Sequence, residues 1–278
     1  MRGVRRRWRA KSLFVVVGGE TARWDHFALN GYARPTSPGL SKIADLINYP
    51  RAFSCGTDTA QSVPCMFSGL SREHFTNAKA EARENLLDIL KRAGIGVLWR
   101  ENQSGCKRVC TRVETEVLTG RAAPTFYPGS TNFDDILVDG LDARITNLDR
   151  DTVMVLQMMG SHGPAYSKRY PENFETFKPA CKEALFSRCD NPSIINAYDN
   201  TIVYTDHVLT RLIGVLSKAS DHGVDAGMYY VSDHGESARR AQHVSPRYAL
   251  CYRARSPDSS SHGHLALAGD ARISWCRS

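Results

Sequence analysis

The sequence lacks any apolar run approaching the roughly 20 residues of a membrane-spanning helix. The apolar residues 13–17 are also too few for the hydrophobic region of a signal peptide. Internal repeats and low-complexity segments are missing as well. We therefore expect a globular chain that carries no export signal or membrane anchor of its own.

Short Cys-x-x-Cys pairs, which structural zinc sites use, are also missing, although the sequence contains 8 cysteines. Most of the cysteines fall in close pairs, at positions 55 and 65, 106 and 110, and 181 and 189. This pattern is typical of disulfides formed in an oxidising compartment, although spacing alone leaves their connectivity open. Disulfides without an export signal predict that an N-terminal portion of the protein is missing here.

Acidic side chains are absent from residues 1–11, which carry six Lys or Arg, and residues 237–278 are net basic too. The formal charge of +7 therefore resides in the two ends, and residues 12–236 are mildly acidic. A nucleic-acid-binding protein usually gathers its cations on one face of the folded domain. This distribution argues against nucleic acid as a partner.

Apolar segments that alternate with amphipathic segments predict a parallel sheet with helices on both faces. We expect buried strands at residues 13–17, 94–99, 153–158 and 228–232, and helices at residues 38–47, 59–69, 82–93, 131–147 and 194–219. The predicted fold class is α/β, a three-layer α/β/α sandwich with a mostly parallel central sheet. Such sheets bind ligands at the carboxyl ends of their strands.

One hydroxyl-rich turn, residues 54–65, lies between two cysteines and runs into an apolar helix. A helix N-terminus held in this way offers backbone N–H groups to an anion such as phosphate, and a hydroxyl there can act as a nucleophile. The simpler interpretation is a helix start whose hydroxyls only cap the helix. The turn alone favours this simpler interpretation.

Polar residues follow three of the predicted strands, at the edge where the turn should also lie. They are Glu20, His162 and the pair Asp233 and His234. Together with Thr59 they offer the ligands that zinc prefers, and a metal there would activate the threonine hydroxyl. Each residue alone has an ordinary alternative, such as a helix cap or a surface turn. Their joint arrival at one edge favours a metal-assisted nucleophile.

Five segments carry a specific resemblance: VVVGGETARWDHFALNGYARPTSP, SCGTDTAQSVPCMFS, LWRENQSGCKRVC, GSHGPAYSKRYP and VSDHGES. They resemble the catalytic domain of phosphoethanolamine transferases, the lipid A-modifying enzymes whose mobile relatives confer colistin resistance. The resemblance covers about residues 13–237 and implies the fold of the alkaline phosphatase/sulfatase-like superfamily. It implies zinc-dependent transfer of phosphoethanolamine from phosphatidylethanolamine to a lipid A phosphate through a phosphothreonine.

The resemblance also implies roles for individual residues. The nucleophile is Thr59, the second threonine of CGTDTA, and the zinc ligands are Glu20, Thr59, Asp233 and His234. Substrate-binding roles, or in part a second zinc site, fall to His162, Glu236, Lys107 and Asn102, although Gln103 stands where the family often has Asn. The implied disulfides are Cys55–Cys65, Cys106–Cys110 and Cys181–Cys189. The implied setting is a monomer at the periplasmic face of the bacterial inner membrane, attached through a missing N-terminal transmembrane domain.

The resemblance ends after Ser237, where the family continues with a segment like LGExxxYLHGxPYxxAP. One permitted set of codons for residues 238–252, read one base later, gives the family-like string LGEHNMYLHGTPYAI. We therefore expect a basic leader (residues 1–11), a catalytic domain (residues 12–237) and a frameshifted tail (residues 238–278). The tail should be poorly ordered, contribute no native disulfide through Cys251 and Cys276, leave a sheet edge unprotected and impair the transferase.

Two other interpretations share these motifs. A soluble phosphatase or sulfatase-like hydrolase would pass the phosphoryl group to water. A defective gene product would retain only a residual fold. The cysteine pairs and the segments DHFALNGY and SVPCMFS favour the transferase.

Overall fold

The computed structural model describes residues 10–120, 132–235, 246–254, 265–266 and 272–273. Its centre is a seven-stranded sheet in the order β2-β7-β6-β1-β5-β3-β4. The strands are β1 (Ser12–Gly19), β2 (Ile47–Phe53), β3 (Gly96–Glu101), β4 (Glu114–Val117), β5 (Thr152–Gln157), β6 (Asp225–Ser232) and β7 (Pro246–Arg253). Two short strands, β8 (Leu265–Ala266) and β9 (Arg272–Ile273), pair separately.

Strand β1 lies in the middle of the sheet, as its nearly continuous apolar sequence predicts for a parallel strand. It pairs in parallel with β5 and with β6, so that Val16 is opposite both Val155 and Tyr229. Strands β3 and β4 extend the parallel arrangement, whereas β7 runs antiparallel to β6 and to β2. The predicted mostly parallel sheet is confirmed.

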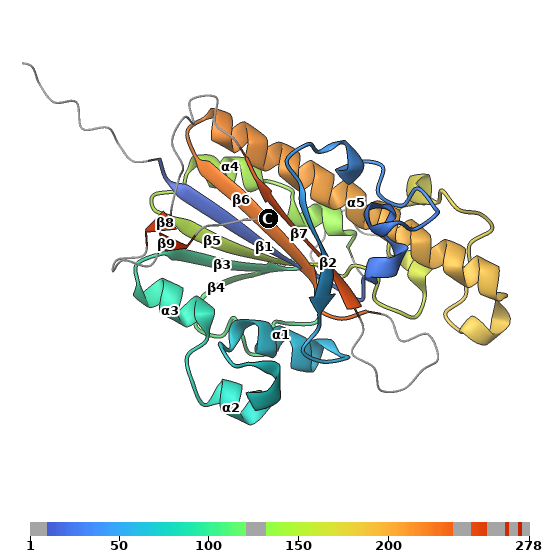
Figure 1. Cartoon of the computed structure of the whole chain (residues 1–278), viewed down its shortest axis with the longest axis horizontal. Coiled ribbons are helices and arrows are strands. Elements are labelled where there is room, and N and C mark those ends of the chain that lie inside the picture. Colours follow the sequence, from blue (N-terminus) through green and yellow to red (C-terminus); the bar gives the residue numbers. More distant parts are fainter. Residues whose placement is uncertain (1–9, 121–131, 236–245, 255–264, 267–271, 274–278) are drawn as a thin grey trace, which may run out of the picture.

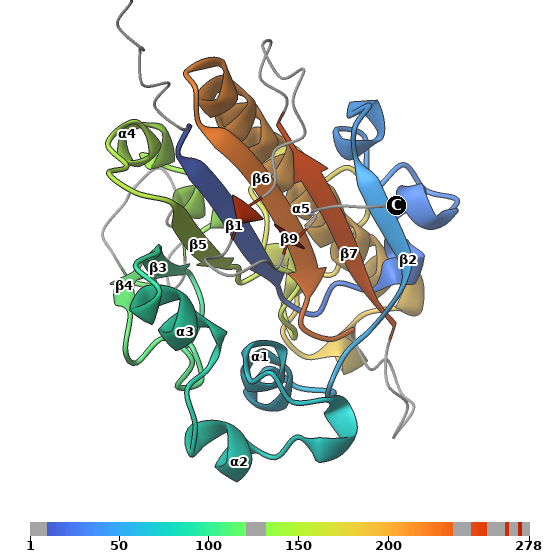
Figure 2. The same cartoon turned by 60° about the vertical axis from the view of Figure 1, so that its left-hand side comes forward.

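Helices lie on both faces of the sheet (Figures 1 and 2). One face carries α5 (Asn191–Asp221) and α4 (Leu141–Thr146), and the other carries α1 (Thr59–Phe67), α2 (Asn77–Glu81) and α3 (Leu86–Arg92). Side chains of a strand alternate between the two faces. Val15 and Val17 therefore pack in the core with α5, whereas Val16 packs against the cluster that contains Val63 of α1.

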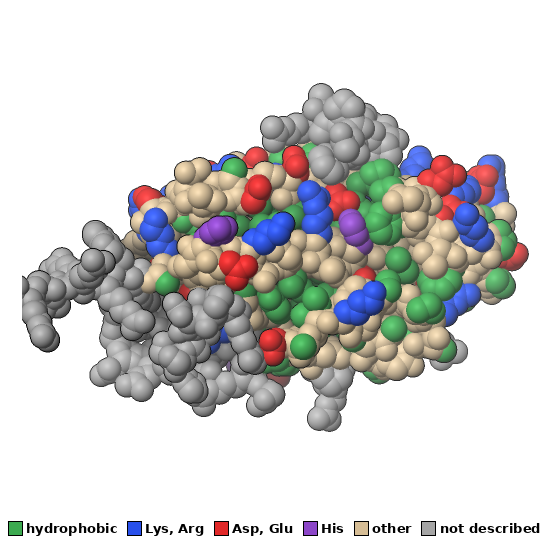
Figure 3. All heavy atoms as spheres, turned by 90° about the horizontal axis from the view of Figure 1, so that it is seen from above, with side chains coloured by type: hydrophobic (Ala, Val, Ile, Leu, Met, Phe, Trp, Pro, Cys, Tyr) green, Lys and Arg blue, Asp and Glu red, His purple; other side chains and the backbone are tan. Residues whose placement is uncertain are grey.

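The longest described helix, α5, is capped by Asp190, whose carboxylate accepts a hydrogen bond from the backbone N–H of Ser193 at 2.7 Å. Its apolar stripe, which includes Leu209, Leu212 and Leu216, is buried against the sheet. The surface of the molecule seen from above in Figure 3 carries basic and acidic side chains interspersed with one another. This mixture is expected of a solvated helical face.

Most predicted elements form with shifted ends, but the helix predicted at residues 38–47 is wrong. The backbone N–H groups of Gly39 and Leu40 donate to the carboxylate of Asp206, and only a 3-10 turn, Leu40–Lys42, forms before β2.

Two other predicted helices are shorter than expected. The helix predicted at 131–147 is interrupted by Gly140 at φ 68°, so that only the turn Asp134–Leu137 and α4 form. The helix predicted at 82–93 is reduced to α3, because a capping box between Asn85 and Asp88 starts it at Leu86.

Part of the C-terminal tail belongs to the sheet, contrary to our expectation of poor order. Strand β7 lies between β6 and β2, with Leu250 opposite Tyr230 on one side and Asn48 on the other. Ala249, Leu250 and Cys251 are buried there. Cys251 is also disulfide-bonded, contrary to the expectation that it contributes no disulfide, and Cys276 lies outside the described residues. Because β7 covers β6, the edge expected to be unprotected is paired.

Candidate active site

Four polar side chains meet at the carboxyl edge of the sheet. Glu20 follows β1, Asp233 and His234 follow β6, and Thr59 begins α1. The Thr59 hydroxyl donates to Oε2 of Glu20 at 2.9 Å and lies 3.5 Å from Nε2 of His234. The same Nε2 is 3.3 Å from Oε1 of Glu20. The structure thus brings together the nucleophile and the three other ligands that the sequence predicts.

The local sequence explains how the turn presents Thr59. Asp58 caps α1, since its Oδ1 accepts from the backbone N–H of Gln61 at 3.0 Å. The Ser62 hydroxyl is used inside the turn, where it bonds to the backbone N–H and C=O of Gly56 at 3.0 and 3.1 Å. Ser62 therefore braces the turn, whereas Thr59 faces Glu20.

All three disulfides implied by the resemblance form: Cys55–Cys65, Cys106–Cys110 and Cys181–Cys189. The first joins the start of the Thr59 turn to the middle of α1. Each pair closes a short loop, so the cross-link limits how far that loop can open.

The Glu20 carboxylate is held in place by backbone that is itself unusual. The adjacent Thr21 has φ 57°, a left-handed conformation that a β-branched residue rarely adopts. Its hydroxyl donates to Oε1 of Glu20 at 2.6 Å, and its carbonyl accepts from the Tyr198 hydroxyl at 2.8 Å. Gly160 packs against the Glu20 backbone so closely that a Cβ would lie 2.8 Å from the Glu20 carbonyl oxygen. The surrounding structure therefore fixes the strained segment.

Glu20, Asp233 and His234 form a cluster that fits a metal ion, since one ligand atom from each lies within 4.8 Å of the others. The two acids are 1% and 0% exposed. Oδ1 of Asp233 accepts from the backbone N–H groups of Thr21 and His234. Its Oδ2 has no hydrogen-bond partner among the described residues. A buried carboxylate oxygen without a partner is costly, and a cation at this position would satisfy it.

The electrostatics of the cluster point the same way. Burial raises the pKa of Asp233 to about 7, and the charge of nearby Glu20 adds to this effect. Burial also opposes the ionisation of Glu20, but hydrogen bonds from His234 and Thr21 hold its pKa at about 2. Burial favours neutral His234, yet its hydrogen bond to Glu20 and the charge of Asp233 raise its pKa to about 9. The two acids thus favour a positive charge between them.

The other predicted site residues lie in different surroundings. His162 is exposed, although the loop that carries it touches Glu20 through the Ser161 N–H, which donates to the Glu20 carbonyl at 3.0 Å. Lys107 is half-buried, with Nζ bonded to the carbonyl and hydroxyl of Ser104. Asn102 is fully buried, and its amide donates to the Asn132 carbonyl and the Asp134 carboxylate. Glu236 lies outside the described residues.

The position of Asn102 changes its expected role. A side chain that is 0% exposed and bonded to its own protein supports the loop from inside. The residue that reaches the site is its neighbour Gln103, whose Nε2 donates to Oε2 of Glu20 at 2.6 Å. Sequence reasoning missed both Gln103 and Thr21. The one available signal was that each stands two residues beyond the end of a strand, next to a predicted site residue.

No helix among the described residues is long and apolar enough to cross a membrane.

Comparisons with known proteins agree with this geometry. Residues 12–263 match the Sulfatase family profile. The chain is 43% identical over 227 residues to the phosphoethanolamine transferase EptA of Escherichia coli K12, covering 82% of this chain and 41% of that protein. It is 42% identical over 236 residues to the phosphatidylethanolamine transferase Mcr-1 of Escherichia coli, covering 82% and 43%. The chain therefore spans about two fifths of the length of these relatives.

Solved structures give the same result. The soluble domain of lipooligosaccharide phosphoethanolamine transferase A from Neisseria meningitidis matches with a TM-score of 0.84 and 36% identity, covering 91% of this chain and 79% of that one. The integral membrane form of that protein matches over 91% of this chain and 49% of its own, with the same score and identity. The C-terminal periplasmic domain of Escherichia coli EptC, solved in complex with Zn, matches at a TM-score of 0.70 and 18% identity, covering 89% and 74%.

Proposed function

We propose, from the premise that this chain belongs to the sulfatase family and is an enzyme related to phosphoethanolamine transferases, that Thr59 is its nucleophile. The observation that carries this proposal is the contact of the Thr59 hydroxyl with Glu20 and His234, beside an oxygen of Asp233 that has no hydrogen-bond partner among the described residues. A hydroxyl at the start of α1 also faces the backbone N–H groups of a helix N-terminus, which favour a phosphate group.

The substrates follow from the relatives. We assign phosphatidylethanolamine as the donor, in keeping with the name of the phosphatidylethanolamine transferase Mcr-1. We assign a lipid A phosphate as the acceptor, in keeping with a further relative named Kdo(2)-lipid A phosphoethanolamine 7''-transferase from Escherichia coli K12. The site would then lie at the periplasmic face of the inner membrane, as for a soluble domain attached to an integral membrane protein. We further propose that the chain acts as a monomer.

The reaction divides into two displacements at phosphorus. In the first, Oγ1 of Thr59 bonds to the donor phosphorus, the bond from phosphorus to the glycerol oxygen breaks, and diacylglycerol leaves with the proton that Thr59 loses. In the second, an oxygen of the acceptor phosphate bonds to the same phosphorus, the bond to Thr59 breaks, and Thr59 regains a proton. Glu20, which accepts the Thr59 hydrogen bond, orients the hydroxyl for the first displacement.

The donor set of the cluster fits zinc. Glu20, Asp233, His234 and the Thr59 hydroxyl would hold the ion, in keeping with the unpartnered buried oxygen of Asp233. Zinc at this position would supply a lowered pKa for the Thr59 hydroxyl and charge stabilisation for the phosphoryl oxygens. We propose that His162 and Lys107 contact the substrate, with Glu236 at the phosphate or a second zinc. Asn102 supports the loop that carries Lys107 from the interior.

The two displacements should depend differently on the C-terminal tail. Formation of the phosphothreonine needs Thr59 and the cluster, which residues 12–235 provide. Acceptance by lipid A would draw on the segment after Ser237, where we expect the chain to depart from the phosphoethanolamine transferases. We therefore propose that this chain forms the intermediate but transfers it slowly.

Intact-mass spectrometry of the zinc-loaded chain after incubation with phosphatidylethanolamine micelles tests this proposal. We expect a mass increase of one phosphoethanolamine group, located at Thr59 by peptide mapping, in wild-type protein and in Thr59→Ser, and none in Thr59→Ala. A label that water removes rapidly would favour the hydrolase. A zinc-binding chain that never acquires a label would contradict the proposed nucleophile, and a chain with neither zinc nor label would indicate a defective product.

A further inference from the structure

Gln103 connects a second part of the chain to the candidate metal ligand Glu20. It stands two residues beyond the end of β3, and its side chain is buried, with 4% of the residue exposed. Its Nε2 donates to Oε2 of Glu20 at 2.6 Å, while its Oε1 accepts from the backbone N–H of Ser104 at 2.8 Å. A reversed amide would place oxygen against the carboxylate and NH₂ against that N–H, so the two bonds together determine the orientation.

The Glu20 carboxylate is held from both sides by these contacts. Oε1 accepts from the Thr21 hydroxyl, and Oε2 accepts from both Thr59 and Gln103. Thr21 is the next residue in the chain, and Thr59 is the proposed nucleophile. Gln103, in contrast, comes from the end of a separate strand, and its side chain takes no part in the proposed displacement. Removing it would leave Oε2 with the Thr59 hydroxyl alone among its hydrogen-bond donors in the described part of the chain.

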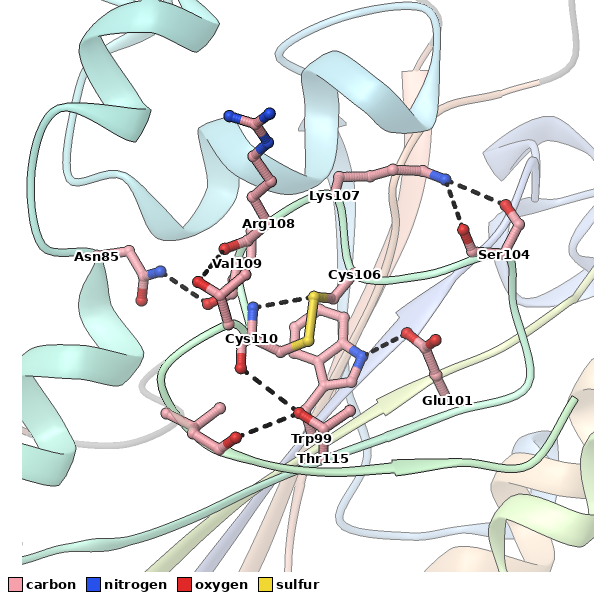
Figure 4. The surroundings of a disulfide bond; sticks show 12 residues. Asn85, Trp99, Glu101, Ser104, Cys106, Lys107, Arg108, Val109, Cys110 and Thr115 are labelled. Carbon is pink, nitrogen blue, oxygen red and sulfur yellow. Dashed lines mark hydrogen bonds between the residues drawn. A yellow bond between two sulfur atoms is a disulfide. The ribbon is translucent and has the colours of Figure 1, made fainter.

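Several hydrogen bonds and a disulfide hold the loop that begins at Gln103, so the loop can keep the Gln103 amide in place against Glu20. Figure 4 shows its hydrogen bonds: Lys107 Nζ reaches Ser104, the Cys110 N–H donates to Sγ of Cys106, and Asn85 donates to the Val109 carbonyl. The Cys106–Cys110 disulfide closes the loop. At its other side, the Thr119 hydroxyl donates to the Gln103 carbonyl at 3.0 Å. Gln103 is therefore fixed at its backbone and at both ends of its amide.

We propose that Gln103 is a positioning residue for Glu20: its amide ties the carboxylate of this metal ligand to the disulfide-closed loop and keeps it oriented for metal binding. The inference rests on the proposed function, since it takes Glu20 as a ligand. Residues that bond to metal ligands from outside orient them, and their loss typically weakens metal affinity by about 10- to 100-fold. The bond from Gln103 to Glu20 is buried and has a charged acceptor, so it is strong enough for such an orienting role.

The test compares zinc affinities measured by competition with a chromophoric chelator. Gln103→Met keeps the length of the side chain but removes its donor. The matched control is Gln157→Met, because Gln157 ends β5 at the same sheet edge and is 2% exposed, and its Nε2 has no hydrogen-bond partner in the described part of the chain. We expect Gln103→Met to bind zinc about 10- to 100-fold more weakly than wild-type protein, and Gln157→Met to bind it as wild-type does.

A second measurement distinguishes a positioning role of Gln103 from a role in stabilising the fold. Thermal unfolding in excess chelator should leave Gln103→Met near the wild-type midpoint, whereas the rise in midpoint on adding zinc should be smaller. If Gln103→Met does not fold, Gln103→Leu, which also lacks a donor, should show weakened zinc binding instead. If the variant that folds binds zinc with wild-type affinity, the inference about Gln103 is overturned, while the proposed metal site stands. A wild-type chain that binds no zinc would overturn the metal site and the inference with it.

Discussion

Asp233 and Thr21 are joined by a hydrogen bond from the backbone N–H of Thr21 to Oδ1 of Asp233, 3.2 Å long, which links the loops after β6 and β1. The bond occupies one oxygen of the carboxylate, and Oδ2 has no hydrogen-bond partner among the described residues, with Nε2 of His234 3.7 Å away. Asp233→Asn keeps the oxygen that accepts this bond but removes the charge. Loss of a residue that hydrogen-bonds to a metal ligand typically weakens metal affinity by up to roughly 100-fold. We expect Asp233→Asn to lower zinc affinity by more than this, because Asp233 is a proposed direct ligand.

The same substitution should act in the opposite direction on the metal-free protein. A neutral amide is less costly to bury beside Glu20 than a second carboxylate. In excess chelator we expect Asp233→Asn to be about 1 kcal/mol more stable than wild-type protein, a rise of about 2–4 °C in the calorimetric midpoint. A variant that is destabilised without metal and still binds zinc tightly would argue for a structural role of Asp233.

The Cys55–Cys65 disulfide should matter for both stability and reactivity, since it closes the turn that presents Thr59. The double substitution Cys55→Ser and Cys65→Ser should lower the free energy of unfolding by about 2–3 kcal/mol and slow the labelling of Thr59. The Cys181–Cys189 pair, with a sequence separation of 8 against 10, is a matched control. Its removal should cost similar stability in urea titrations and leave the labelling rate unchanged. If the two variants slow the labelling of Thr59 equally, the Cys55–Cys65 disulfide has no specific role in presenting Thr59.

Strands with uniform apolar character were predictable, and those without it were not. Residues 13–17 and 153–158 are almost wholly apolar, and the strands β1 and β5 form there in the centre of the sheet. Strand β2 contains Asn48 and Pro50, and β4 is largely exposed, so neither pattern indicates a strand. The sheet supplies their hydrogen-bond partners from distant residues, such as Ala249 opposite Tyr49. Such pairing is tertiary information that a local pattern does not contain.

The candidate site was predictable where its residues end strands. Glu20, Asp233 and His234 each follow an apolar run, and parallel strands bring such positions to one edge. Gln103 also stands beyond a strand end, but that position does not reveal its role, which depends on a 2.6 Å contact with a residue 83 positions away. The position of Thr21 does not reveal its role either, because its positive φ arises only when Glu20, Asp233 and Tyr198 surround it.

Low pH should destabilise the start of α3, because it protonates the Asp88 carboxylate. Hydrogen bonds from the Arg112 guanidinium hold the pKa of Asp88 below its usual value, and burial only partly opposes this. A lowered folded-state pKa means that the carboxylate stabilises the fold above the unfolded value of about 3.9 and loses this effect as the pH falls through the folded value. Asp88→Asn should therefore cost about 1–2 kcal/mol at pH 7, since the Asn85 N–H and Arg112 lose a charged acceptor.

Urea titrations of this variant at several pH values provide the check. The difference from wild-type protein should be full at pH 7 and should shrink below about pH 4. Glu84→Gln is the control, because its ion pair with Arg92 is exposed on both sides and should contribute little at any pH. A deficit that stays constant from pH 7 to pH 3 would show that the shape of Asp88, rather than its charge, supports the helix start.

Strand β7 offers a direct test of whether the C-terminal tail is part of the folded domain. Leu250 is 0% exposed and packs in the main core, although it lies in the tail that was expected to be poorly ordered. Leu250→Ala should lower the free energy of unfolding by about 2–5 kcal/mol, because a buried leucine is replaced by a cavity. Val117→Ala, at a 57% exposed position on the opposite edge strand, should change stability little. If both substitutions are neutral in urea titrations, residues 246–253 do not contribute to the cooperative fold. A selective loss at Leu250 means that residues 246–253 stabilise the sheet, because their pairing with β6 and β2 requires extended backbone and buried apolar side chains such as Leu250.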